Sequence, residues 1–217
     1  MNGAVITALN EAGTIAELVY QLQKQGLEVC VINDGSTDDT GLVAQLAGAH
    51  VIHHAQPKGI GKSLVEAWTY AIAQGWKYTV QIDAGNSHRA TDAIAMIQAR
   101  QDLVIGSRFL PTSRYIGRGW RATLSKITAA ACNFATHQEI SDWTSGYRVF
   151  SLNALRKLSL ENYITDMHTW QIEVIHAAIK HDLTIAEAPI TYRAGNSSLK
   201  LKTIDDLIKV YLWILTA

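Results

Sequence analysis

Short strands alternate with helices through the first hundred residues of this chain, and this order limits the fold more than any other feature of the sequence. The runs that we expect to be strands are residues 4–9, 27–32, 51–54, 78–82 and 103–105. The segments between them carry apolar residues with helical spacing. Because an intervening helix returns the chain to the same end of the sheet, such strands lie parallel. The sequence therefore predicts an α/β fold, with a Rossmann-like, mostly parallel sheet and helices on both faces.

The length and composition are those of one domain. The chain has 217 residues, 48% of them hydrophobic, and a formal net charge of zero. This is enough apolar material for a single core, and the lack of net positive charge argues against nucleic-acid binding. Cys30 and Cys132 lie far apart in apolar surroundings, which indicates free thiols in a reducing compartment. Since we recognise neither a signal peptide nor an apolar run of membrane-spanning length, we expect a cytoplasmic protein.

The second half of the chain is less regular. No acidic residue occurs between Leu103 and Gln138, although basic residues do. A long helix is expected there, and one of its faces carries the apolar residues Trp120, Leu124, Ile127, Ala131 and Phe134. Residues 183–192 are expected to form a strand near a sheet edge, because Pro189 cannot donate a ladder hydrogen bond.

The segment 78–88 joins a strand to a cluster of polar side chains. Residues 78–82 alternate as a strand does, and Asp83, Asn86 and His88 follow within six residues. Open α/β sheets bind ligands beyond the carboxyl ends of their strands. Asp83 and His88 are residue types that hold a divalent ion. A polar turn in which Asp83 caps its own backbone is the alternative.

Seven motifs in order resemble those of family 2 glycosyltransferases with the GT-A fold. More narrowly, they are similar to the branch of dolichyl-phosphate mannose synthases and polyprenyl-phosphate glycosyltransferases. The motifs are TALNE at 7–11, VINDGSTD at 31–38, GIGK at 59–62, DAG at 83–85, VIGSRF at 104–109, DWTSGYR at 142–148, and IAEAPITYR at 185–193 with SSLK at 197–200. The resemblance implies a GT-A domain over 1–202 and a C-terminal amphipathic helix over 203–217.

The resemblance also implies an activity. The reaction would move a hexose from a nucleotide sugar, of the GDP-mannose or UDP-glucose type, to polyprenyl phosphate, with inversion at the anomeric carbon. Related enzymes carry an interfacial helix at the position of residues 203–217, so we expect a peripheral contact with the cytoplasmic face of a membrane. A helix packed on its own domain or on a second subunit is the alternative.

The resemblance assigns catalytic roles to Asp83, Arg108 and Asp142. Asp83 would hold Mn²⁺ or Mg²⁺ at the leaving diphosphate, with His88 as a further ligand. The usual second aspartate is Gly85 here, so the need for a metal stays open, and arginines are the alternative means of neutralising the diphosphate. Arg108, which has no acidic neighbour in the sequence, would contact a phosphate. Asp142 would orient the acceptor, because a polyprenyl phosphate is already anionic and needs little help from a base.

The other assigned residues bind the two substrates. The nucleotide sugar would be held by Asn10, Glu11, Asp34, Gly59 and Lys62. The acceptor would be bordered by Arg118, Arg121, Ser145, Arg148, Glu173, Ser198 and Lys200. Helix capping, a plain turn and a solvated basic face are the alternatives for members of these sets. Five histidines show no ligand spacing and are interpreted as ordinary residues: His53, His54, His168, His176 and His181.

Two other functions stay open. A glycosyltransferase of the same fold with a saccharide or small-molecule acceptor would need a base, and Asp142 would then act through its protonation. A non-catalytic protein that only binds nucleotide sugars would explain the aspartate lost at Gly85. An acceptor panel and the effect of Asp83→Asn on turnover separate these from the leading hypothesis.

Overall fold

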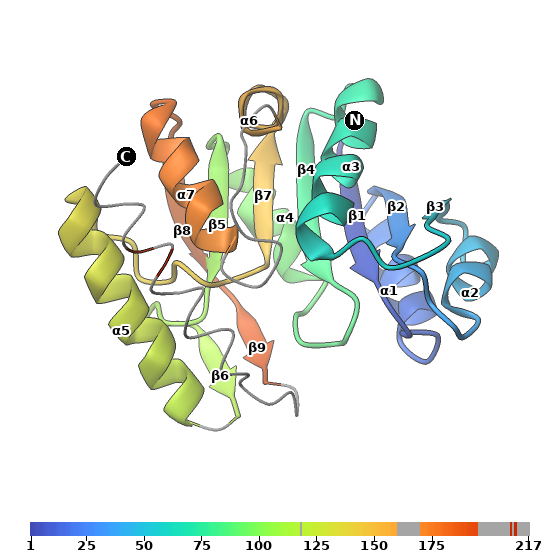
Figure 1. Cartoon of the computed structure of the whole chain (residues 1–217), viewed down its shortest axis with the longest axis horizontal. Helices are drawn as coiled ribbons and strands as arrows, with labels where there is room; N and C mark the ends of the chain where they lie inside the picture. The colour runs from blue at the N-terminus through green and yellow to red at the C-terminus, as the bar shows by residue number, and fades with distance from the viewer. Residues whose placement is uncertain (118, 160–169, 195–208, 210, 212–217) are drawn as a thin grey trace.

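In the computed structural model, which describes residues 1–117, 119–159, 170–194, 209 and 211, the main sheet has seven strands. Their order is β3-β2-β1-β4-β7-β5-β8 (Figure 1). The bounds are β1 Gly3–Ala8, β2 Glu28–Asn33, β3 His50–His53, β4 Tyr78–Asp83, β5 Leu103–Ser107, β7 Arg148–Ser151 and β8 Ile185–Pro189. Every strand of this sheet runs parallel to the others except β7, which is antiparallel to β4 and β5. The predicted α/β class and the mostly parallel sheet are confirmed.

Helices cover both faces of the sheet, as predicted (Figure 1). One face packs against α1 (Ile15–Gln23), α2 (Thr40–Leu46) and α4 (Asp92–Gln98). The other packs against α3 (Ile60–Ala73), α6 (Leu152–Leu158), α7 (Trp170–Lys180) and part of α5 (Gly119–Thr136). Strand side chains alternate between the two layers, since successive residues of a strand point to opposite faces. On β4, Val80 and Ile82 join the α1 side, whereas Thr79 and Gln81 face the α3 side.

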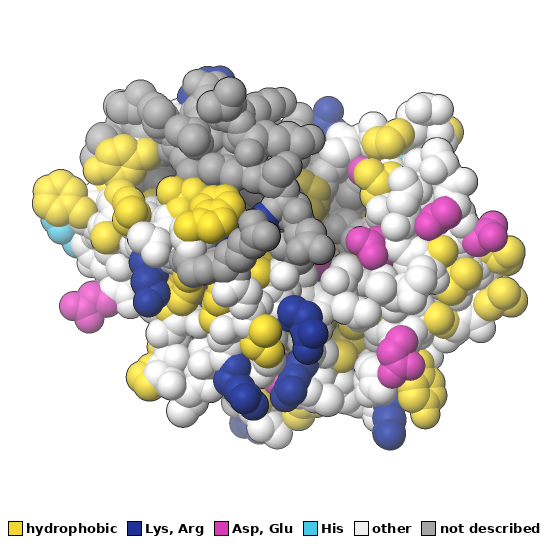
Figure 2. Space-filling view, turned by 90° about the horizontal axis from the view of Figure 1, so that it is seen from below, with side chains coloured by type: hydrophobic (Ala, Val, Ile, Leu, Met, Phe, Trp, Pro, Cys, Tyr) yellow, Lys and Arg dark blue, Asp and Glu magenta, His cyan; other side chains and the backbone are white. Residues whose placement is uncertain are grey.

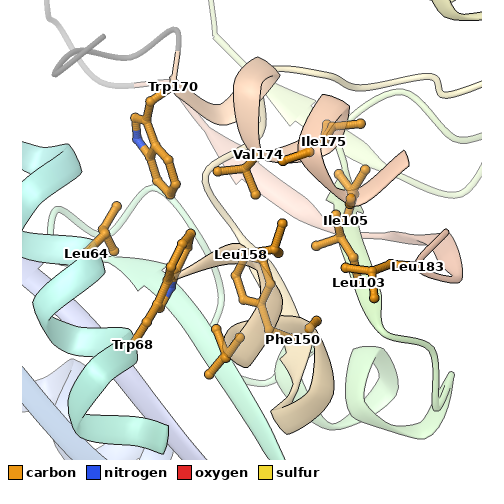
Figure 3. Packing of buried hydrophobic residues seen from close by; sticks show 14 of the residues in the cluster. Leu64, Trp68, Leu103, Ile105, Phe150, Leu158, Trp170, Val174, Ile175 and Leu183 are labelled. Carbon is orange, nitrogen blue, oxygen red and sulfur yellow. The ribbon is translucent and has the colours of Figure 1, made fainter. Parts of the chain in front are cut away.

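Aromatic rings from three elements meet in the core on the α3 side (Figure 3). Trp68 of α3 lies 5.1 Å from the ring centroid of Phe150 and 5.5 Å from that of Trp170, and all three side chains are fully buried. The Trp68 indole N–H donates to Oε1 of Gln81 at 3.2 Å. Gln81 in turn donates from Nε2 to the carbonyl of Gly146 at 3.1 Å. A buried amide therefore connects the aromatic core to the loop that precedes β7, because a polar group in such a core needs a partner.

The predicted edge strand is confirmed, but one strand in the middle of the sheet was not predicted. The expected strand 183–192 divides at Pro189 into β8, which is the last strand of the main sheet, and β9 (Thr191–Arg193). β9 pairs in parallel with β6 (Arg114–Ile116) in a separate two-stranded sheet. The sequence did not predict β7, which inserts between β4 and β5. β7 is only four residues long, so its residue pattern is too short to predict a strand or its antiparallel direction.

Other expectations about the chain meet different outcomes. Cys30 and Cys132 are buried free thiols, as predicted. Among the described residues, no helix has both the length and the apolar character needed to cross a membrane. The expected terminal helix 203–217 lies almost wholly outside the described residues, so its proposed interfacial role stays a prediction.

Candidate active site

The polar residues singled out in the sequence meet at one edge of the sheet, where the parallel strands end. Asn10 and Glu11 follow β1, Asp34 follows β2, Asp83 ends β4 and Arg108 follows β5. This edge lies at the bottom of Figure 1, and Figure 2 views the molecule from that side. Loops at the carboxyl ends of parallel strands are where open α/β sheets bind ligands. The arrangement supports a site at this edge.

The loops after β1 and β2 are tied together by short hydrogen bonds. The Thr37 backbone N–H donates to Oδ1 of Asn10 at 2.9 Å, and the Glu11 N–H donates to Oγ1 of Thr40 at 2.7 Å. Asn10 has a positive φ of 58°, a conformation that asparagine tolerates better than most residues. Glu11 is half-buried and accepts from the Thr14 hydroxyl at 2.9 Å through Oε2. Asn10 therefore shapes the loops, and its exposed side chain is partly used in doing so.

Asp34 is buried and holds the start of α3. Its carboxylate accepts from the backbone N–H of Lys58 at 2.8 Å and of Gly59 at 3.1 Å, and its Oδ1 lies 2.7 Å from Nδ1 of His54. Burial alone would raise the pKa of Asp34, but the hydrogen bonds from His54, Lys58 and Gly59 outweigh it and lower that pKa. Asp34 thus fixes the turn at Gly59, a residue predicted from the sequence motifs to bind the nucleotide sugar. Lys62, in the first turn of α3, is exposed.

Asp83 and His88 form a close pair at the centre of the edge. Nε2 of His88 lies 3.4 Å from Oδ2 of Asp83, whose side chain is about half exposed at 47%. The His88 ring is buried between Tyr147 and Tyr192, with centroids at 5.0 and 5.1 Å. Nδ1 of His88 has no hydrogen-bond partner among the described residues. The aromatic rings therefore hold the imidazole with one nitrogen directed at the Asp83 carboxylate.

Two glycines leave room around these carboxylates. A Cβ on Gly146 would lie 3.2 Å from both carboxylate oxygens of Asp83, and a Cβ on Gly85 would lie 3.3 Å from Oε1 of Glu11. Glu11 thus occupies the neighbourhood where the side chain of the usual second aspartate would begin. The Glu11 carboxylate therefore lies beside the position of the missing aspartate.

The donor set suits a divalent ion that arrives with a diphosphate. Asp83 offers oxygen and His88 offers nitrogen, a combination that Mn²⁺ accepts better than Mg²⁺ does. Within the described ranges, no group of three ligating side chains could hold an ion by itself. Ions of this kind are commonly bound by one or two protein ligands together with substrate phosphates. The residues therefore fit an ion that Asp83 and His88 would hold together with a bound diphosphate.

Arg108 and Asp142 form a buried, bidentate ion pair. Nε of Arg108 lies 2.7 Å from Oδ2 of Asp142, and Nη2 lies 2.7 Å from Oδ1. The Arg108 backbone N–H adds a third bond at 3.1 Å. The Asp142 side chain is completely buried and that of Arg108 is 11% exposed. Burial alone would lower the pKa of Arg108, but Asp142 raises it. Although the sequence gives Arg108 no acidic neighbour, the fold supplies one from 34 residues away.

A third carboxylate, which sequence reasoning missed, supports this pair. Glu187 of β8 accepts from the Ser141 N–H at 2.9 Å, the Ser141 hydroxyl at 2.6 Å and the Asp142 N–H at 3.1 Å. It fixes the backbone that carries Asp142. The available signal was its place in the IAEAP motif, opposite Ile105 in the β5–β8 register.

Two residues assigned to the acceptor are buried and bonded within the fold. Ser145 is buried and donates to the carbonyl of Gly106 at 2.6 Å. Arg148 is fully buried, with Nε donating to the Ser145 carbonyl at 3.0 Å and Nη2 to that of Gln171 at 2.8 Å. Both side chains are therefore engaged within the fold, and their role at the acceptor stays a prediction.

The remaining assigned residues have mixed positions. Glu173 of α7 is also fully buried. Arg121 is half-buried, and its guanidinium carbon lies 5.3 Å from the Trp120 ring centroid. Arg118, Ser198 and Lys200 lie outside the described residues, so their roles stay predictions.

Comparison with known proteins identifies the family. The sequence model for "Glycosyl transferase family 2" matches residues 4–162. The chain belongs to this family. It is 30% identical over 176 residues to the polyprenol monophosphomannose synthase of Mycolicibacterium smegmatis, a match covering 76% of this chain and 66% of that protein. It is 26% identical over 204 residues to the undecaprenyl-phosphate mannosyltransferase of Micrococcus luteus, covering 88% of this chain and 83% of that protein.

Solved structures confirm the GT-A expectation for this family 2 glycosyltransferase. The glucosyl-3-phosphoglycerate synthase of Mycobacterium tuberculosis superimposes with a TM-score of 0.73 at 21% identity. The match covers 99% of this chain and 78% of that one. That protein has been solved in complex with Mn²⁺, UDP and glucosyl-3-phosphoglycerate, and also with Mg²⁺ and UDP.

The ion pair yields a prediction about stability. Asp142→Ala leaves the Arg108 guanidinium buried without its partner, so we expect the free energy of unfolding to fall by about 3–5 kcal/mol. Urea unfolding followed by circular dichroism measures this change. Glu139→Ala, at an exposed acid three residues earlier, is the control and should change the free energy by less than about 0.5 kcal/mol. Equal effects of the two substitutions would show that the pair does not hold this part of the fold.

Proposed function

We propose that this family 2 glycosyltransferase moves a hexose from a nucleotide diphosphate sugar to a polyprenyl phosphate, with inversion at the anomeric carbon. The observation that carries the proposal is that the Asp142 carboxylate is buried and paired with Arg108. The names of the two mannosyl-transferring relatives and the order of the sequence motifs support the same substrate classes.

Asp142 is the carboxylate expected beside the acceptor, and it is already fully engaged. It accepts from three nitrogens of Arg108 and also from the backbone N–H of Thr144 at 3.2 Å, in a place closed to solvent. Because its oxygens already accept these hydrogen bonds and are closed to solvent, this carboxylate is not available to a hydroxyl of the acceptor. A saccharide hydroxyl needs a general base, whereas a phosphate monoester does not.

The bond changes balance without a proton transfer. An oxygen of the acceptor phosphate forms a bond to the anomeric carbon as the bond from that carbon to the diphosphate breaks. The electron pair leaves with the nucleoside diphosphate, so negative charge grows on the donor side. Attack and departure on opposite sides of the carbon give inversion. Catalysis then depends on orientation and on stabilising the leaving diphosphate.

The donor side of the site would stabilise that leaving group. Asp83 and His88 would hold a divalent ion there, and the ion would supply Lewis acidity at the diphosphate when bound. Asp34 sets the Gly59 turn and the start of α3 beside the loops of Asn10 and Glu11. These loops surround the place where the nucleotide sugar is expected. The aromatic rings of Tyr147 and Tyr192 keep the His88 ring in place.

The acceptor is a lipid, and one surface of the molecule suits a bilayer. On α5, Trp120, Ile127 and Phe134 are 45%, 61% and 78% exposed. Their spacing of seven residues places them on one side of the helix. The stripe is therefore not part of the core, and the residues of α5 that are buried, where burial is described, are Ala129 and Cys132. We call the surface formed by Trp120, Ile127 and Phe134 the α5 stripe.

Charge near the α5 stripe favours anionic lipid. The exposed side chains of Arg114 and Lys126 lie in the sequence stretch that lacks acidic residues. Figure 2 shows Lys and Arg side chains gathered towards the centre of the lower face and most Asp and Glu side chains to the right, away from α5. Each basic residue near an anionic surface adds roughly 1 kcal/mol of attraction. We therefore propose a peripheral contact in which the α5 stripe meets an anionic bilayer.

The donor half of the proposal is tested by thermal unfolding with GDP and with UDP, each with and without Mn²⁺. A ligand at about one hundred times its Kd adds roughly 2.7 kcal/mol, which is easily seen. We expect one diphosphate to stabilise the protein, and more strongly with Mn²⁺. Asp83→Asn should remove the part that depends on Mn²⁺, whereas Glu139→Gln should not. Stabilisation by neither diphosphate contradicts the nucleotide-sugar donor, and stabilisation unaffected by Mn²⁺ contradicts the metal.

The membrane half is tested by sedimentation with vesicles. We expect the protein to bind vesicles that contain phosphatidylglycerol, and the double substitution Ile127→Ser and Phe134→Ser to weaken binding at least about tenfold, because apolar surface is lost. The matched control is Leu42→Ser with Leu46→Ser, two exposed apolar residues of α2 that are 55% and 79% exposed. No binding by the unaltered protein, or an equal loss in both double variants, contradicts the proposed surface.

A further inference from the structure

His54, which follows β3, lies between two carboxylates. Its Nδ1 is 2.7 Å from Oδ1 of Asp34, and its Nε2 is 2.7 Å from Oε2 of Glu66. The imidazole side chain is only 1% exposed. No sequence pattern singles out this histidine, because its partners are 20 residues before it and 12 residues after it.

The geometry sets the charge of the ring. A carboxylate is only an acceptor when it is ionised, and a neutral imidazole has a single N–H to donate. Burial alone would raise the pKa of both Asp34 and Glu66, but the hydrogen bonds from His54 and from other donors outweigh it and lower both pKa values. Both acids are therefore ionised at neutral pH. Two short bonds to two ionised carboxylates require both ring nitrogens to donate, as only an imidazolium can.

The surrounding charges are balanced by this cation. Nζ of Lys58 lies 3.2 Å from Oε2 of Glu66 and is half exposed. Cys30 of β2 faces the same cluster as a neutral thiol, because burial and then the charge of Glu66 raise its pKa to about 12. The neighbouring His53 turns away, with Nδ1 at 3.3 Å from Nδ2 of Asn33. The imidazolium and the Lys58 ammonium thus offset the two carboxylates. Without the imidazolium, two like charges would face a buried space.

The cluster fixes two loops of the proposed donor site relative to each other. Asp34 accepts hydrogen bonds from the backbone N–H groups of Lys58 and Gly59. The backbone N–H of His54 donates to the Asn33 carbonyl at 3.0 Å. A Cβ on Gly35 would lie 2.6 Å from the nitrogen of Pro57, so the two loops are in direct contact. Asp34 therefore fastens the loop after β2 to the first turn of α3.

We infer that His54, held as an imidazolium between Asp34 and Glu66, is a positioning residue for the nucleoside diphosphate of the donor. The inference rests on the proposed function for its ligand. It does not make His54 a group that touches the substrate. His54 acts through Asp34, which sets the shape of the loops that surround the nucleotide.

The protonation state is tested first and without any ligand. Nitrogen-15 NMR of histidine-labelled protein near neutral pH should show both ring nitrogens of His54 carrying protons, with the signal assigned by its loss in His54→Gln. A spectrum in which one nitrogen of His54 is unprotonated overturns the inference, since one of the two carboxylates would then lack a donor.

The positioning role is tested by affinity for whichever of GDP and UDP the unaltered protein binds. His54→Gln keeps a polar side chain but can serve only one carboxylate well, and we expect it to weaken binding about tenfold. Glu66→Gln should weaken it less, because Asp34 keeps its own bonds. The matched control is His50→Gln, at an exposed histidine of β3 whose ring stacks on Tyr70. It should leave the affinity unchanged.

Measuring the melting temperature beside the affinity separates positioning from simple stabilisation. If His54→Gln lowers the melting temperature but binds the diphosphate as tightly as the unaltered protein, His54 is structural only and the inference is overturned while the proposed function stands. If the unaltered protein binds neither diphosphate, both are overturned, and the NMR result still reports the ion cluster.

Discussion

The site depends on one buried amide that joins it to the core. Gln81 lies on the central strand β4 and accepts from the indole of Trp68 while it donates to the carbonyl of Gly146. Gly146 in turn lies against Asp83, where even one added carbon would be 3.2 Å from the carboxylate. Gln81 therefore links the packing of Trp68 against Phe150 and Trp170 to the loop that lies against Asp83. Two hydrogen bonds and one close contact thus separate the aromatic core from the Asp83 carboxylate.

The charged groups at the sheet edge are mostly paired before any substrate arrives. Arg108 is bound to Asp142, and Asp34 shares His54 with Glu66. These pairs hold loops in place, which is the role that preorganisation requires when the reaction needs no proton transfer. Asp83, with a half-exposed carboxylate beside His88, is arranged differently, as a ligand for an ion would be. The division between paired and exposed carboxylates is what favours an anionic acceptor over a sugar hydroxyl.

Much of the fold could be predicted from the sequence, because strand and helix patterns are local. The five early strands and the edge strand at Pro189 were predicted near their observed bounds. β7 could not be found in the same way, since its place between β4 and β5 depends on long-range pairing rather than on its own four residues. The sequence also predicted that Asn10, Asp34, Asp83 and Arg108 meet at one edge, because each lies at the carboxyl end of a parallel strand.

The partners of those residues could not be predicted. Asp142 reaches Arg108 from 34 residues away, and His54 joins Asp34 to Glu66 across two elements, so neither contact has a spacing in the sequence. The exposure of Phe134 could not be predicted either. An apolar stripe predicts an amphipathic helix, but it does not predict that small residues, Ala129 and Cys132, are the ones that face the core.

The most direct measurement is the transfer of labelled sugar to a lipid. The protein is incubated with a polyprenyl phosphate, Mn²⁺ and either GDP-mannose or UDP-glucose labelled in the hexose, and the label is followed into the solvent-extracted lipid. The account predicts label in the lipid from one of the two donors, an inverted anomeric configuration in the product, and loss of transfer in Asp83→Asn. Label that remains in the water-soluble fraction with every donor, or that passes only to a soluble acceptor, would contradict it.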